Sequence, residues 1–124
     1  MNMRDSINHA RVAGPLPQPD GAVEFEFRFP ATDSVFPGHF PKRPLLPGVF
    51  QLEMSHLAAE WALQTRLSLR EVTKAKFLRP IVPEDSVHLR LKWSENEGVI
   101  VVRASFSVRN QPAGESQLRL CRSA

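Results

Sequence analysis

Cysteine and long apolar runs are both scarce in this chain of 124 residues. Cys121 is the only cysteine, so no disulfide can form within the chain, as is typical of proteins kept in a reducing compartment. No apolar run approaches the roughly 20 residues needed to span a bilayer. Residues 1–14 contain no apolar segment of the kind found in secretion signals. We therefore expect a cytoplasmic protein without a membrane span.

A dense basic tract is also missing. The formal net charge is +3 at pH 7, and the lysines and arginines are interleaved with acidic residues. Nucleic-acid-binding domains usually cluster their basic residues on one face, so no nucleic-acid partner is expected. A local basic patch would still be enough to bind an acidic protein.

The length and the apolar patterning predict one domain over residues 1–124. A helix is expected at 48–64, where helix formers prevail and apolar residues lie on nearly every side, so it should be largely enclosed. Residues 7–13 indicate a weak strand, and 14–21 a proline-stiffened connection. Alternating apolar and polar residues predict strands at 22–29, 86–93 and 99–108, and further strands are expected at 71–82, interrupted by Pro80, and at 116–122.

The later strands are joined by short segments, including a turn expected at 110–115, and short turns favour antiparallel neighbours. A single apolar helix must be covered by another element. The predicted fold class is therefore α+β, with a curved antiparallel sheet wrapped around one long helix.

Prolines are concentrated around one histidine between residues 35 and 47. Pro37, Pro41, Pro44 and Pro47 exclude regular secondary structure there, so the segment should form a stiff loop. Such a loop could hold His39 still enough to act as a general base. Considered alone, His39 has the alternative of being an ordinary exposed loop histidine.

The expected helix carries a stripe of polar residues, namely Glu53, His56, Glu60 and Gln64. Glu53 stands between the apolar residues Leu52 and Met54. A carboxyl group between apolar walls stays protonated more readily and could serve as an acid. The alternative is that the stripe is the solvated side of an amphipathic helix.

Gly48 stands at the first turn of the helix, directly after Pro47. Free N–H groups and the helix dipole at this end suit a developing oxyanion, and glycine lets a ligand approach the backbone. The alternative is a simple junction between loop and helix.

Together these residues spell H-F-P-x-x-P-x-x-P-G-V-x-x-x-E, from His39 to Glu53. This pattern resembles the active-site motif of the FabZ-type β-hydroxyacyl-acyl-carrier-protein dehydratases. A second block of that family, K-F-x-R-P-x-x-P-G-D, resembles residues 74–86. The order of elements also resembles the family's hot-dog fold over about residues 7–122.

The resemblance implies a role for each matching residue. His39 matches the catalytic base, Glu53 the catalytic acid, and Gly48 the glycine whose N–H binds the thioester carbonyl. Phe40, Pro47 and Val49 belong to the same motif and are expected to contact substrate. The family works as a dimer whose subunits share each active site, and it uses neither metal nor cofactor.

Acyl carrier proteins are acidic, so the resemblance also implies positive charge at the mouth of the substrate tunnel. The residues expected to dock the carrier are Lys42, Arg43, Lys74, Lys76 and Arg79.

Three departures from the family pattern leave the natural substrate and pathway open. Leu57 stands where the family has glutamine, so a polar contact is either lost or supplied by His56. Glu84 replaces the glycine of the second block, and the chain contains no tyrosine to gate a tunnel. Glu53 itself favours the branch that dehydrates without isomerising, since the isomerising relatives carry aspartate there.

The sequence therefore predicts dehydration of (3R)-hydroxyacyl thioesters on acyl carrier protein, in the synthesis of fatty acids or of related specialised lipids and polyenes. The assembly would be a homodimer, a higher oligomer of dimers, or a heteromer with a related dehydratase. Two alternatives stay open: a hot-dog acyl thioesterase, and a non-catalytic subunit that binds an acyl carrier.

Overall fold

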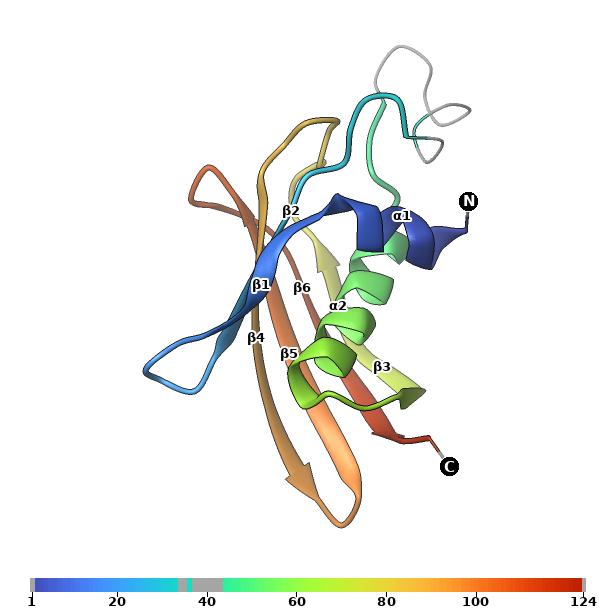
Figure 1. Ribbon diagram of the computed structural model, residues 1–124, viewed down its shortest axis with the longest axis vertical. Coiled ribbons are helices and arrows are strands. Elements are labelled where there is room, and N and C mark those ends of the chain that lie inside the picture. The colour runs from blue at the N-terminus through green and yellow to red at the C-terminus, as the bar shows by residue number, and fades with distance from the viewer. Residues whose placement is uncertain (1, 34–35, 37–43, 124) are drawn as a thin grey trace.

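Two helices and six strands make up the computed structural model, which describes residues 2–33, 36 and 44–123 (Figure 1). The elements follow in the order α1 (Met3–Ala10), β1 (Arg11–Pro17), β2 (Val23–Phe27), α2 (Gly48–Leu63), β3 (Leu67–Phe77), β4 (Val87–Asn96), β5 (Val99–Val108) and β6 (Gln111–Arg122). Within these residues no helix is both long enough and apolar enough to cross a membrane.

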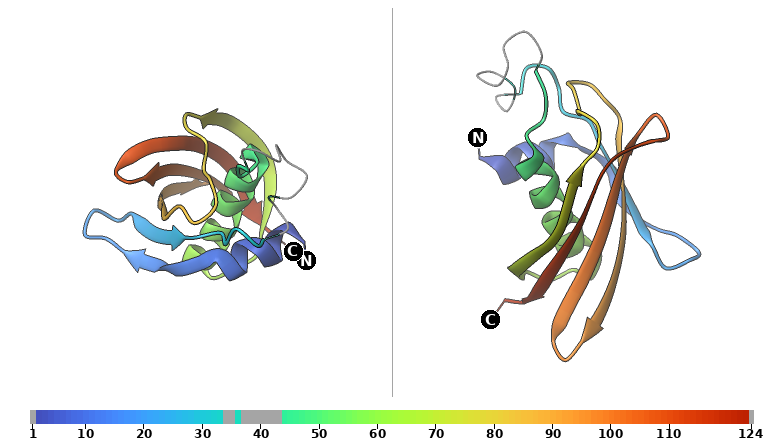
Figure 2. Two further views of the ribbon diagram at one scale, coloured as in Figure 1. Left: turned by 90° about the horizontal axis from the view of Figure 1, so that it is seen from above. Right: turned by 180° about the vertical axis from the view of Figure 1, so that it is seen from behind.

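The strands form one antiparallel sheet in the order β1-β2-β4-β5-β6-β3. The connections β4–β5 and β5–β6 are two-residue hairpins, Glu97-Gly98 and Arg109-Asn110, and all four residues have positive φ. Such turns match the right-handed twist of the strands they join, which helps the sheet to curve. The sheet bends around α2, as the view from above shows (Figure 2).

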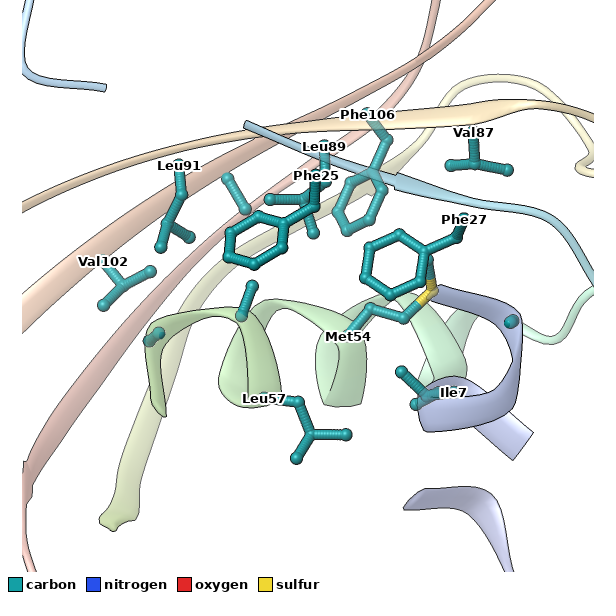
Figure 3. Close-up of a cluster of buried hydrophobic side chains, with 14 of the residues drawn as sticks. Ile7, Phe25, Phe27, Met54, Leu57, Val87, Leu89, Leu91, Val102 and Phe106 are labelled. Carbon is teal, nitrogen blue, oxygen red and sulfur yellow. The ribbon is translucent and has the colours of Figure 1, made fainter. Parts of the chain in front are cut away.

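Alternation along the strands supplies the apolar surface on which α2 lies. Phe25, Leu89 and Phe106 face one another across β2, β4 and β5, are at most 2% exposed, and point towards the helix (Figure 3). Met54 points from α2 back into this cluster, and Leu57 points away from the sheet (Figure 3). The α+β class and the helix wrapped by an antiparallel sheet are therefore as predicted.

The N-terminal prediction was wrong. Instead of a weak strand at 7–13 and a connection at 14–21, α1 precedes a strand that runs to Pro17. The Asn2 side chain caps α1 by accepting from the Asp5 N–H at 2.8 Å, and Ile7 is fully buried where α1 packs against α2. β1 tolerates its prolines because it is an edge strand.

Two boundaries near the C-terminal half also differ from prediction. β3 ends at Phe77, before Pro80, instead of continuing to residue 82. β6 begins at Gln111, inside the turn expected at 110–115. Pro112 can lie in this strand because the β5–β6 register shifts there, and prolines are tolerated at such irregularities.

The middle of α2 is enclosed as expected, but its first turn and the neighbouring edge strand are not. Val49 is 52% exposed, and Leu67 is the single buried residue of β3. Leu69 and Val72 of β3 lie opposite the fully buried Leu120 and Leu118, so they face the helix side of the sheet while remaining exposed. The helix side of the sheet is therefore left uncovered along β3.

Candidate active site

The N-terminus of α2 is the first feature of the candidate site. Pro47 precedes it in an extended conformation, and no side chain caps the helix. The Phe50 N–H bonds back to the Pro47 carbonyl at 2.9 Å. N–H groups of a first turn have no acceptor within their own helix, so Gly48 begins α2 with a donor directed away from the helix. This end of the helix is electrostatically suited to negative charge.

Gly48 lies directly beneath an aromatic ring. A Cβ placed on Gly48 would come within 2.6 Å of the Phe77 ring, which is 52% exposed at the end of β3. The two residues border a groove of about 240 Å³ that is also lined by Leu45, Gln51, Leu78 and Pro80. Glycine is therefore required here for space, and the groove runs beside the helix end.

Glu53 lies elsewhere on the helix. Its Oε1 accepts a hydrogen bond from Arg4 Nε at 2.8 Å, and its side chain is about one-quarter exposed. The same guanidinium donates through Nη1 to Glu60 Oε1 at 3.2 Å. The surroundings thus differ from the apolar walls expected for Glu53, because α1 brings a cation to it.

The rest of the polar stripe holds the chain after α2. His56 Nε2 lies 2.7 Å from the Leu67 carbonyl oxygen and 3.6 Å from Glu60 Oε2, and that carboxylate oxygen accepts from the Leu67 N–H at 2.9 Å. Gln64 ends the helix in the left-handed region. His56 is thus committed to the start of β3.

The basic residues of the second block contact side chains on β6. Lys74 and Lys76 lie 2.7 and 3.9 Å from Glu115 Oε1. The hydrogen bond from Lys74 and its charge lower the pKa of Glu115. Arg79 donates to the Gln111 side-chain oxygen at 3.2 Å, and it stands beside the groove at Gly48.

Part of the predicted site lies outside the described residues, namely His39, Phe40, Lys42 and Arg43. The structure therefore places Gly48, Pro47 and Val49 at one end of α2 and Glu53 on a different side of it. No group of three potential metal ligands occurs within residues 2–33, 36 and 44–123.

Sequence reasoning missed three residues that border these positions. Arg4 is 49 positions from Glu53, and no pattern in the sequence connects them. Phe77 was included only as part of a family block. Gln51 was passed over within an apolar run, although a polar residue three positions after a candidate oxyanion glycine is a usable signal.

Comparison of folds assigns the chain to the hot-dog class. A structure of the dehydratase heterocomplex ApeI:P from Xenorhabdus doucetiae is 25% identical, with a TM-score of 0.75 over 90% of this chain and 96% of that one. An uncharacterized protein from Pyrococcus horikoshii shares the fold at 16% identity, with a TM-score of 0.70 over 91% of this chain and 81% of that one.

Sequence comparison gives the family. The family described as ApeI-like, ApeI dehydratase, matches residues 17–117, so the chain belongs to the ApeI-like dehydratase family. A 3-hydroxyacyl-[acyl-carrier-protein] dehydratase FabZ from Histophilus somni is 35% identical over an alignment of 96 residues that covers 70% of this chain. The match spans 64% of that relative's length. The resemblance to FabZ-type dehydratases is thereby confirmed.

The Arg4 bridge yields a prediction about stability. Arg4→Met should lower the free energy of unfolding by about 0.5–1 kcal/mol, because one guanidinium serves two carboxylates across the α1–α2 contact. The loss should shrink in high salt, which screens exposed charges. Urea unfolding at low and high salt measures both effects.

Arg28→Met is the matched control for Arg4→Met. Arg28 is exposed, and its side chain has no hydrogen bond or ion pair among the described residues. Equal stability of the two variants at low salt would show that the bridge contributes nothing.

Proposed function

We propose that this chain dehydrates 3-hydroxyacyl thioesters carried on acyl carrier protein, giving trans-2-enoyl thioesters. The observation that carries the proposal is the family match over residues 17–117, which includes His39, Gly48 and Glu53 in the motif order. The relative from Histophilus somni is named as a 3-hydroxyacyl-[acyl-carrier-protein] dehydratase, which agrees with this reaction class. Fatty-acid synthesis and specialised lipid or polyene synthesis both use it.

In the proposed mechanism His39 removes a proton from the carbon next to the thioester. The electron pair moves into the thioester, and the uncapped N–H of Gly48 stabilises the oxygen as it gains charge. The bond to the 3-hydroxyl then breaks, the double bond forms, and the hydroxyl takes a proton supplied through Glu53 and leaves as water. General acid–base catalysis contributes about 10²–10⁴-fold to such a step, and one oxyanion donor about 10²–10³-fold.

Glu53 serves the departing hydroxyl, directly or through a water molecule. Arg4 donates to Oε1, and among the described residues no hydrogen bond to Oε2 is seen. The second oxygen is therefore left to pass a proton to the hydroxyl oxygen as the hydroxyl departs.

A site that uses both Gly48 and Glu53 requires two copies of the fold. The groove at Gly48 opens beside β3, whereas Glu53 faces α1. The two residues are five positions apart, and successive helix residues turn by about 100°, so they project in widely different directions. We propose a homodimer, or a heteromer with a related dehydratase, in which each site takes Gly48 from one chain and Glu53 from the other.

Incubation with a trans-2-enoyl thioester distinguishes the proposed dehydratase from two alternative functions, because each gives a different product. A hot-dog thioesterase would release free thiol from a trans-2-enoyl thioester, and a non-catalytic carrier-binding subunit would do nothing to it. A dehydratase would add water reversibly. Ultraviolet absorbance of the enoyl thioester together with a thiol reagent distinguishes the three.

The catalytic proposal predicts the behaviour of two variants in that assay. His39→Ala and Glu53→Gln should each lose about 10²–10⁴-fold in the rate of enoyl-thioester hydration. His39→Ala should keep the wild-type melting temperature, and Glu53→Gln should lower it only slightly, because it weakens the Arg4 bridge. His88→Ala and Glu71→Gln, which alter exposed residues on β4 and β3, should keep the full rate. Near-normal hydration by folded His39→Ala would contradict the mechanism.

The uncovered edge strand predicts where two copies meet. Val72 is 39% exposed in the middle of β3 and faces the helix side of the sheet. We expect the wild-type protein to sediment with at least twice the chain mass of 14.0 kDa. Val72→Glu should sediment as single chains, because it places a charge on the proposed contact surface. Val12→Glu changes a valine that is 60% exposed on the opposite edge strand and should leave the assembly intact. A wild-type protein that sediments as a single chain at micromolar concentration would overturn the two-copy site.

Carrier docking is proposed for the basic residues around the motif. Reversing Lys42 and Arg43 to glutamate should slow turnover of carrier-bound substrate about tenfold at low salt, because charge complementarity speeds encounter with an acidic partner. Turnover of a small N-acetylcysteamine thioester should be unchanged. Arg103→Glu, on an exposed position of β5, is the control. Equal losses on both substrates would mean that these charges do not act through docking.

A further inference from the structure

Gln51 holds a buried hydrogen-bond acceptor that nothing satisfies. Its side chain comes from the first turns of α2 and the residue is only 3% exposed. The amide oxygen Oε1 has no hydrogen-bond partner among the described residues. Leaving such an atom unpaired costs about 1–3 kcal/mol, so the position calls for a donor.

The neighbouring polar contacts between α2 and the sheet are complete. One turn further along the helix, Ser55 donates to the Gln51 backbone oxygen at 2.9 Å and lies 2.8 Å from the Ser116 hydroxyl of β6. Facing Gln51 on the same strand is Gly114, and a Cβ there would come within 2.3 Å of the amide oxygen. The absence of a side chain at Gly114 makes room for the amide.

Gln51 also lines the groove at the start of α2, with its buried amide oxygen turned towards Gly114 of β6. Gln51 is one turn from Gly48 on the same side of the helix, and both line the groove together with Leu45, Phe77, Leu78 and Pro80. Two polar side chains line the groove: Arg79 at its border, and Gln51. An apolar groove with one placed acceptor fits an apolar chain that carries one donor.

We propose that Gln51 is a specificity-determining residue, whose amide oxygen accepts a hydrogen bond from a hydroxyl group on the acyl chain. The assignment rests on the proposed function, in which Gly48 holds the thioester oxygen one turn away. The thioester oxygen and sulfur bring no donor, whereas the 3-hydroxyl does. The enoyl product has lost that hydroxyl, so the same contact favours binding of substrate over product.

Binding can be measured without turnover by replacing the thioester with an ester, whose neighbouring C–H is less acidic and which, like the thioester, brings no donor. The probes are the 3-hydroxybutyryl and butyryl esters of the pantetheine analogue in which a hydroxyl replaces the thiol, titrated calorimetrically into wild-type protein, Gln51→Met and the control Gln117→Met. Gln117 lies on the outer side of β6, away from the groove. Wild type and control should bind the hydroxylated probe about fivefold more tightly than the butyryl probe, as one neutral hydrogen bond allows. In Gln51→Met the ratio should fall to about one, through weaker binding of the hydroxylated probe.

Three results would overturn the assignment: a ratio near one in wild type, an unchanged ratio in Gln51→Met, or equal weakening of both probes. The last would assign Gln51 to the pantetheine arm common to both probes. If Gln51→Met does not fold, NMR of the wild-type protein takes its place. The side-chain amide resonance of Gln51 should shift on addition of the hydroxylated probe and stay unchanged with the butyryl probe. Dehydration of the true thioester is measured separately. Wild-type protein that shows the ratio but no dehydration would refute the proposed function and leave the role of Gln51 standing.

Discussion

The burial of α2 against the concave side of the sheet decides which parts of the chain are free for chemistry. One helix cannot cover six strands. α2 packs against β4, β5, β6 and the start of β3, where Leu67 is buried, and the remainder of β3 is left exposed. The first turn of α2 and the end of β3 meet at the boundary of this covered area, where Gly48 lies against Phe77. The candidate site therefore lies at the edge of the apolar core, where the first turn of α2 meets the end of β3.

The same boundary explains why a second copy would complete the protein. The exposed residues Leu69 and Val72 continue the apolar surface that Leu120 and Leu118 form inside the core. Covering them with another chain removes apolar area from water, which is worth about 25 cal/mol per Å². In the proposed two-copy site, the second chain supplies its own Glu53 at the groove. Association of two chains would therefore bury the exposed apolar residues of β3 and complete the proposed site.

Much of the fold could be predicted from alternation, because β2, β4 and β5 bury one face and expose the other. α1 could not, since its short helix is stabilised largely by packing of Ile7 and its neighbours on α2. The start of β6 was mistaken for a turn because Pro112 and Gly114 are ordinarily turn residues. Here tertiary contacts override the local preference, and Gly114 has a packing reason to be there.

The candidate site shows the same division between local and distant information. The spacing from Pro47 to Glu53 predicts correctly that a helix begins at Gly48 and carries the carboxylate. It says nothing of Arg4, which reaches Glu53 from another helix, nor of the side of α2 to which Glu53 turns. Helical periodicity alone gives relative directions around α2, and the identity of each neighbouring element comes from the folded chain.

Gln51 and Ser55 show how differently two polar residues on one side of a helix can be treated. Ser55 is fully satisfied by Gln51 O and Ser116, and its hydroxyl joins α2 to β6. Gln51 faces the same strand, yet its oxygen is unpaired, and an apolar side chain of similar size would avoid that cost. Gly114 opposite forgoes the packing that a side chain would provide in a strand, which also weakens the fold. Stability alone would favour neither residue, and the proposed substrate hydroxyl would supply the donor that the Gln51 oxygen lacks.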